Sequence, residues 1–169
     1  MSRSSRRAIA QTKCVGTSWS SVSSVTPSTP YAREVIRAAK EAGRPVAIVS
    51  NNSEPAIRAY LDVHTLTGWI APIVGRAYAT PDRMKPNPAP IVDAMTVLGV
   101  DPATCALVGD SVTDIEAARA AGVRSIGDAN KVGKTQALTD AGADAVAEGA
   151  NGMGALAAAL RDCPVSGDV

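Results

Sequence analysis

The chain has 169 residues, which is enough for one domain with a real core, or for one domain and a tail. Apolar residues make up 46% of it, but aromatics only 3% with no Phe, so Ala, Val, Ile and Leu have to build the core. That composition is typical of helices packed closely over a parallel sheet. The net charge of +1 creates no field for nucleic acid or a membrane surface, and no apolar run approaches the ~20 residues of a membrane span.

The N-terminal segment differs in composition from the rest. Residues 1–30 contain nine serines, four basic residues and no acid. Such a segment is typical of a transit peptide or a disordered arm, and it also fits a leader produced by a misplaced start or a shifted reading frame. The sequence leaves these alternatives open. We assign residues 1–28 to an arm that is disordered or contributes one strand.

From Pro30 onward, short apolar runs alternate with amphipathic segments, and glycines repeatedly follow the predicted helices. The predicted strands are 46–49, 69–75, 105–108, 123–126 and 143–147. The predicted helices are 31–42, one capped by Ser53, 88–98, 113–121, 132–141 and 153–161. This alternation predicts an α/β fold, a three-layer doubly wound parallel sheet. The core domain is placed at residues 29–162, with a tail at 163–169.

Three polar segments follow predicted strands and therefore meet at one edge of the sheet. Ser50 and Asn51 come after the first strand of the core, and their hydroxyl, amide and backbone N–H groups suit an oxyanion. Lys85 is a cation in a loop stiffened by two prolines. Asp110 and Asp114 are spaced by one helical turn, and such a carboxylate pair suits Mg²⁺. Together they are the parts of a site for phosphate and metal.

Each of these residues also has a structural explanation. Ser50 and Asp110 fit an ordinary turn and a helix cap, and Lys85 fits a solvated loop. Ser50, Lys85, Asp110 and Asp114 could equally persist as caps and a buried ion pair around a vacant pocket. The three cysteines are widely spaced without a CxxC motif, which indicates reduced thiols in a cytoplasmic protein.

In this order the segments resemble the haloacid dehalogenase superfamily, in the branch of phosphoglycolate-phosphatase-like hydrolases. Val-Ser-Asn-Asn resembles its motif II, Met-Lys-Pro-Asn-Pro its motif III, and Val-Gly-Asp-Ser-Val-Thr-Asp-Ile-Glu its motif IV. The resemblance runs from about residue 29 to about 160. It implies that Ser50 and Asn51 bind the phosphoryl group and that Lys85 neutralises both the phosphate and the attacking nucleophile. It also implies that Asp110 ligates Mg²⁺ and that Asp114 supports the metal or holds Lys85.

Motif I of that superfamily, Asp-x-Asp-x-(Thr/Val), has no counterpart here. Its first Asp is the nucleophile and its second the acid and base. The first Asp of this chain is Asp62, and the upstream segment Lys-Cys-Val-Gly-Thr places Lys13 and Val15 where the two aspartates stand. Related enzymes carry a helical cap between motifs I and II, and the short spacing here predicts no cap domain.

Two functions of different classes follow from the resemblance. The first is a Mg²⁺-dependent phosphohydrolase acting on a small phosphorylated metabolite, inactive as written, because loss of a covalent nucleophile costs on the order of 5 kcal/mol or more of barrier. The second is a non-catalytic or truncated domain that binds phosphate or a protein partner. A receiver-like phosphoacceptor is the weakest alternative, since receivers carry an acidic pair after their first strand. Mg²⁺ binding is expected to be weak or absent, and the oligomeric state is not indicated.

The missing motif also leaves a gap at the centre of the expected sheet. The upstream candidate for this place is residues 8–15, where Gln11, Thr12 and Lys13 interrupt the apolar run that a central strand requires. We therefore expect either a strand of marginal stability there, or an open edge between the two neighbouring strands.

Overall fold

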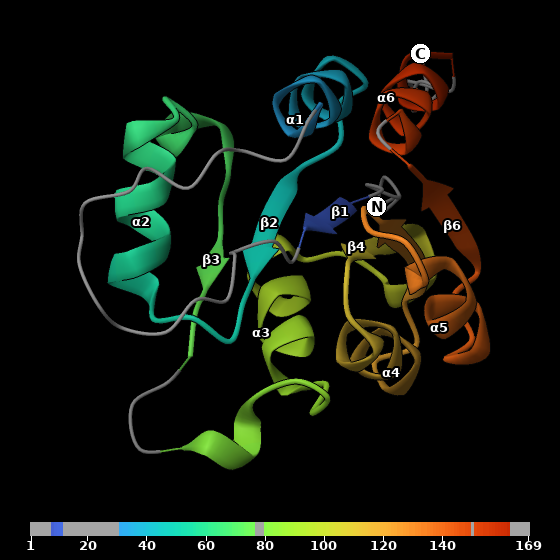
Figure 1. The fold of residues 1–169 in the computed structure, drawn as a ribbon. Helices are drawn as coiled ribbons and strands as arrows, with labels where there is room; N and C mark the ends of the chain where they lie inside the picture. The colour runs from blue at the N-terminus through green and yellow to red at the C-terminus, as the bar shows by residue number, and fades with distance from the viewer. Residues whose placement is uncertain (1–7, 12–30, 77–79, 150, 163–169) are drawn as a thin grey trace, which may run out of the picture.

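A computed structural model describes residues 8–11, 31–76, 80–149 and 151–162. Its strands form one six-stranded sheet in the order β3-β2-β1-β4-β5-β6, and every pairing is parallel (Figure 1). The strands are β1 (Ala8–Gln11), β2 (Val46–Val49), β3 (Ile73–Val74), β4 (Cys105–Gly109), β5 (Arg124–Ala129) and β6 (Ala145–Glu148). The predicted α/β class with a doubly wound parallel sheet is confirmed.

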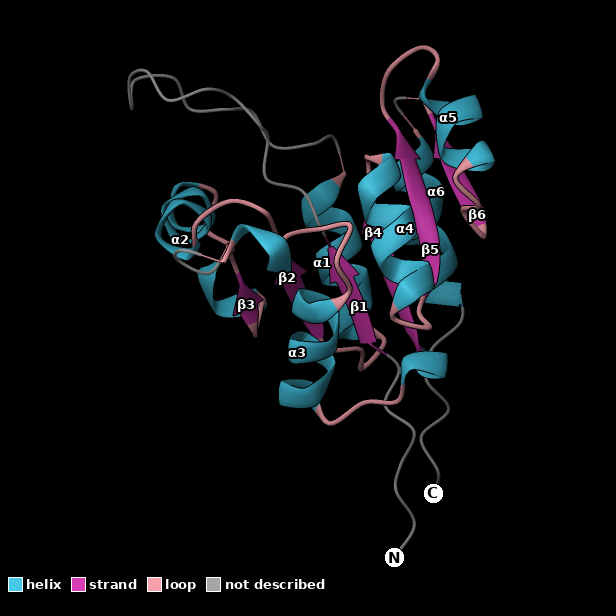
Figure 2. Cartoon of the chain, turned by 90° about the horizontal axis from the view of Figure 1, so that it is seen from below, coloured by secondary structure: helices cyan, strands magenta, loops and turns pink. Residues whose placement is uncertain are grey.

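Helices cover both faces of the sheet and make the three layers. They are α1 (Ala32–Glu41), α2 (Glu54–Val63), α3 (Ala89–Leu98), α4 (Val112–Ala120), α5 (Lys134–Asp140) and α6 (Gly152–Asp162). Helices α1 and α6 lie together on one face, while α3, α4 and α5 lie on the other (Figures 1 and 2). In the described part of the chain, no helix has the length and apolar character needed to cross a membrane.

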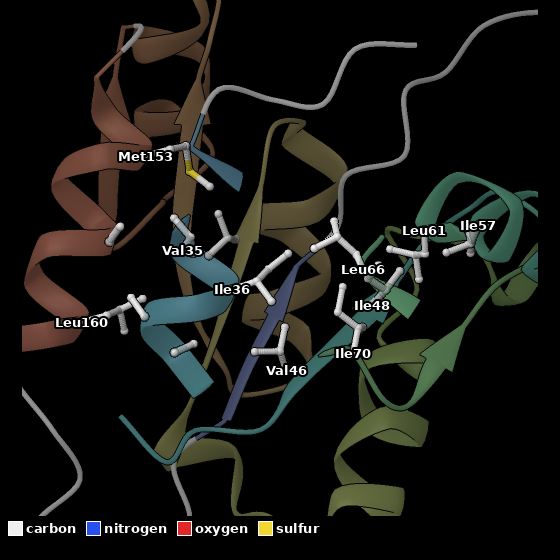
Figure 3. Close-up of a cluster of buried hydrophobic side chains, with 14 residues drawn as sticks. Val35, Ile36, Val46, Ile48, Ile57, Leu61, Leu66, Ile70, Met153 and Leu160 are labelled. Atoms are coloured by element: carbon white, nitrogen blue, oxygen red, sulfur yellow. The ribbon is translucent and has the colours of Figure 1, made fainter. Parts of the chain in front are cut away.

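Strand β2 is apolar throughout because both of its faces are covered. Val46 and Ile48 pack into a cluster with α1, α2 and α6 (Figure 3), whereas Ala47 and Val49 pack into a second cluster under α3 and α4. All four are buried. Since a buried aliphatic side chain contributes about 1.5–3 kcal/mol relative to exposure, a strand covered on both faces holds β2 firmly in place. The residues that follow it are therefore well positioned.

The central place in the sheet is taken by β1. Its backbone pairs with β2 from Ile9↔Val46 to Gln11↔Ile48, and with β4 from Ala8↔Cys105 to Gln11↔Val108. The alternative of an open edge between β2 and β4 is therefore not what this structure has. The marginal stability expected for this strand stays a prediction, which hydrogen exchange of its amides against those of β4 would test. Lys13 and Val15 lie outside the described residues.

Several element boundaries differ from the sequence-based prediction. The strand predicted at 69–75 is reduced to Ile73–Val74, because residues Thr67–Trp69 form a 3₁₀ turn and Pro72 has no N–H to donate to a neighbouring strand. Strand β5 continues to Ala129 instead of ending at Ile126, because its last residues pair with β6 despite a glycine and an aspartate in the run. Helix α5 correspondingly begins at Lys134, two residues later than predicted.

Candidate phosphate site at the carboxyl edge of the sheet

The carboxyl edge, where the strands end, gathers the predicted site residues around a buried lysine. The Lys85 ammonium donates to Asp114 Oδ1 at 2.6 Å and to the backbone oxygen of Val49, the last residue of β2, at 3.2 Å. Both charged side chains are almost fully buried. An ammonium has three N–H groups. Within the described residues the third N–H of Lys85 has no hydrogen-bond partner, so it can be donated to an anion.

Asn51 fixes the loop that carries Lys85. Its side-chain amide donates to the backbone oxygen of Lys85 at 3.2 Å, and its carbonyl oxygen accepts the backbone N–H of Lys85 at 2.9 Å. This two-bond clamp joins the end of β2 to a segment 34 residues further along the chain. The Asn51 side chain is therefore used in bonds within the protein. The group of Asn51 that can bind a ligand is its backbone N–H.

Ser50 presents a hydroxyl donor at the same edge. Its Oγ accepts the backbone N–H of Asn52 at 3.1 Å, and its backbone N–H donates to Val74 in β3. Because a hydroxyl has one hydrogen and the oxygen is already an acceptor, that hydrogen is available to a phosphate oxygen. Ser50 is buried, with 5% of its surface exposed, so such a bond would form in a partly dry site.

Asp114 is held by the start of α4 as well as by Lys85. Its Oδ2 accepts the backbone N–H groups of Asp110 and Ser111, each at 3.1 Å, while Ser111 Oγ accepts the Asp114 N–H at 3.3 Å. This is a capping box, with Ser111 as the helix cap. Gly109 makes room for it, since a Cβ there would lie 2.4 Å from the Asp114 Cβ.

Asp110 has a cationic partner that the sequence analysis missed. The Lys134 ammonium donates to Asp110 Oδ2 at 2.8 Å and to the Asp110 backbone oxygen at 2.7 Å. Asn130 donates a long bond of 3.5 Å to the same carboxylate oxygen and one of 3.3 Å to Asp128. Lys134 and Asn130 both follow the carboxyl end of β5. The rule that polar residues after a strand lie at this edge, which indicated Ser50 and Asp110, could therefore have indicated them as well.

The described residues do not fit a divalent metal at this edge. Both carboxylates bind ammonium groups, and Asp114 accepts two backbone N–H groups besides. In the described ranges, no group of three His, Cys, Asp or Glu side chains could hold a metal ion. Mg²⁺ usually needs one or two carboxylates that are not already neutralised, along with waters and phosphate oxygens.

A cavity of about 170 Å³ opens beside Ser50 and Asn51. Ser50 and Asn51 form one wall, and Arg76, Arg83 and Met84 are among the residues of the others. Arg83 is paired with Asp93 at 2.7 Å. This cavity is smaller than the 300–1,000 Å³ typical of drug-sized ligand sites, so it has room for a small organic group only.

Two other residues considered from the sequence lie away from this arrangement. His64 ends α2 and contacts the ring of Tyr60, with the ring centroids 4.3 Å apart. Cys105 is a buried free thiol at the opposite, amino end of β4.

Comparison with known proteins gives a consistent family. A family model described as a haloacid dehalogenase-like hydrolase matches residues 20–122. A phosphoglycolate phosphatase of Aquifex aeolicus is 36% identical over 99 residues, which are 59% of this chain and 44% of that protein. One from Neisseria meningitidis is 39% identical over 88 residues, 52% of this chain and 37% of that protein. The chain spans about two fifths of the length of these curated relatives.

Solved structures agree with the sequence matches. A HAD family hydrolase from Deinococcus radiodurans, solved with bound phosphate and sodium, superposes with a TM-score of 0.68 at 31% identity, covering 78% of this chain and 58% of that one. A haloacid dehalogenase-like protein from Agrobacterium tumefaciens gives 0.62 at 31% identity, covering 76% and 64%. The family match extends over more than half of the sequence, so the chain belongs to the haloacid dehalogenase-like hydrolases, as its three motifs indicated.

Proposed function

We propose that this chain binds the phosphate group of a small phosphorylated metabolite in the cytoplasm and does not hydrolyse it. The observation that carries the proposal is the buried Lys85, held by Val49 and Asp114 with one N–H left to donate among the described contacts. The Ser50 hydroxyl and the Asn51 backbone N–H lie at the end of the strand that Lys85 contacts. Three donors from two loops suit the oxygens of a phosphate monoester.

The sequence supports the proposed absence of turnover. Hydrolysis through an aspartyl-phosphate needs a carboxylate to attack phosphorus and a second one to move the proton. The chain has no Asp before Asp62, and its two acids before Ser50, Glu34 and Glu41, lie in or at the end of α1. Asp114 cannot take over as nucleophile, because its oxygens accept bonds from Lys85 and two backbone N–H groups.

The small cavity limits the organic part of the ligand. At about 170 Å³, it accommodates a few non-hydrogen atoms next to Ser50 and Asn51. We therefore propose a short-chain phosphate monoester as the ligand. Phosphoglycolate, the compound in the names of the matched relatives, is the first one to test.

Binding and turnover can be measured separately. Inorganic phosphate and phosphoglycolate are titrated into ¹⁵N-labelled protein in EDTA and in Mg²⁺, and hydrolysis of p-nitrophenyl phosphate is followed in parallel. We expect saturable shifts of the Ser50, Asn51 and Lys85 amides with a millimolar or tighter Kd, and hydrolysis at the background rate. Ser50→Ala is expected to weaken binding, whereas the control Ser53→Ala, at a partly exposed serine of the same loop, should leave it unchanged.

Two results would contradict the proposal. Hydrolysis that requires Mg²⁺ and disappears in Asp110→Asn would show that the chain is an active enzyme after all. Amide shifts that never saturate, or that Ser50→Ala leaves unchanged, would show that the edge does not bind phosphate. In that case the surviving explanation of Lys85 and Asp114 is a structural ion pair.

A further inference from the structure

We propose that Lys134 is a built-in cation that occupies, at Asp110, the place of a divalent metal and so keeps such metals out. Two oxygens of Asp110 accept hydrogen bonds from the Lys134 ammonium, the carboxylate Oδ2 at 2.8 Å and the backbone oxygen at 2.7 Å. Hard oxygen donors of this kind are the ligands that Mg²⁺ takes. Lys134 thus uses the donors that a metal at Asp110 would need.

The positive charges of the two cations oppose their binding to this oxygen together. Mg²⁺ binds oxygen at about 2.0–2.1 Å. With the Lys134 ammonium 2.8 Å from Oδ2, a metal on that oxygen would lie less than about 5 Å from a full positive charge. The repulsion acts in a partly buried place, where water screens it only in part, because the two side chains are 28% and 29% exposed.

The position of Lys134 in its helix supports a role beyond helix stability. It is the first residue of α5, where the positive end of the helix dipole disfavours a cation, and the first turn contains no acid. Lys131 lies in the loop just before α5 and is exposed. Within the described residues, it is Lys134 and not Lys131 that reaches Asp110. The contact with Asp110 compensates for an otherwise unfavourable position.

Mn²⁺ is a suitable probe, because it prefers the same oxygen ligands and broadens the NMR signals of nearby amides. It is titrated into the ¹⁵N-labelled full chain and into Lys134→Met. We expect no localised broadening in the unaltered protein. In Lys134→Met we expect saturable broadening centred on Asp110, Ser111 and Asn130, with a Kd on the order of 1 mM.

Four further variants test the assignment. Lys131→Ala, the matched control, should behave like the unaltered chain, and Lys134→Arg, which keeps the charge, should still exclude Mn²⁺. Asp110→Asn combined with Lys134→Met should lose the broadening that the single variant gained. Lys134→Gln repeats the test if the methionine variant does not give the dispersed spectrum of a folded protein.

The proposal is overturned if the unaltered chain binds Mn²⁺ at Asp110 as tightly as Lys134→Met does. It is equally overturned if folded Lys134→Met or Lys134→Gln shows no localised broadening, since Lys134 would then not be what excludes the metal. These outcomes involve no phosphate. Failure of this inference is therefore distinguishable from failure of the proposed phosphate site.

Discussion

Two lysine–aspartate pairs lie at the same edge of the sheet, and they differ in burial. Lys85 and Asp114 are 2.6 Å apart with side chains that are 5% and 4% exposed. Lys134 and Asp110 are 2.8 Å apart with side chains that are 28% and 29% exposed. The distances are nearly equal, so differences in their contributions should come from burial and from the other bonds that each carboxylate accepts.

The two pairs therefore contribute differently to the stability of the fold. Taking an ion pair out of water costs several kcal/mol per ion, which the pair recovers only through close contact and further hydrogen bonds. Asp114 has those further bonds, because two backbone N–H groups at the start of α4 donate to it. Removing one partner of the Lys85–Asp114 pair leaves the other charge buried, with its loss of hydration no longer compensated. Lys134 and Asp110 keep part of their hydration, so either partner can be lost more cheaply.

The largest effect is expected for Asp114→Ala. It leaves the Lys85 ammonium buried without its counter-ion, and we expect the free energy of unfolding to fall by about 3–5 kcal/mol. Urea unfolding followed by circular dichroism measures it. The matched control is Asp93→Ala, which breaks the exposed pair with Arg83, and it should cost about 1 kcal/mol or less.

Adding Lys85→Met sharpens this result. If the cost of Asp114→Ala is mainly the unpaired ammonium, the double variant should be more stable than Asp114→Ala alone. A double variant that is less stable by the full sum of the two single effects would show that Asp114 acts through the helix cap instead.

The next effect is expected for Gly109→Ala, which pushes the same pair apart without removing it. The added Cβ would lie 2.4 Å from the Asp114 Cβ and 2.7 Å from its carboxylate, so Asp114 has to move. We expect a loss of about 1–3 kcal/mol in the same unfolding measurement. The control is Gly68→Ala, where a Cβ has nothing within 4 Å. Equal stability of the two variants would contradict the crowding seen at Gly109.

Part of the site around the buried pair was within reach of the sequence, because the strand ends and the family resemblance agree on it. Apolar runs predicted β2 and β4, and polar residues directly after them, Ser50 and Asp110, had to meet at the carboxyl edge. The family resemblance implied two alternative roles for Asp114, and the observed contact is the one with Lys85. What the pattern did not contain was the orientation of Asn51, whose side chain binds the Lys85 backbone instead of facing a ligand.

The second pair was missed because the strand that precedes Lys134 was predicted too short. Ending β5 at Ile126 placed Asp128 and Asn130 in a turn and Lys134 inside a helix, so the rule that found Ser50 and Asp110 was not applied to them. Glycine and aspartate are poor strand formers by themselves, and pairing with β6 overrides that preference. Tertiary pairing of this kind is not visible in local composition.

The smallest effect is expected for Lys134→Met in the absence of metal. It removes the more exposed ion pair, but it also removes an unfavourable cation from the start of α5. Asp110 can then be hydrated. We expect the free energy of unfolding to change by about 1 kcal/mol or less, and the change to shrink in 1 M salt, where charges are screened within about 3 Å. The effect of Asp114→Ala should respond much less to salt, because its pair is buried. A loss of several kcal/mol for Lys134→Met would mean that both pairs hold the fold together, and the contrast between them would disappear.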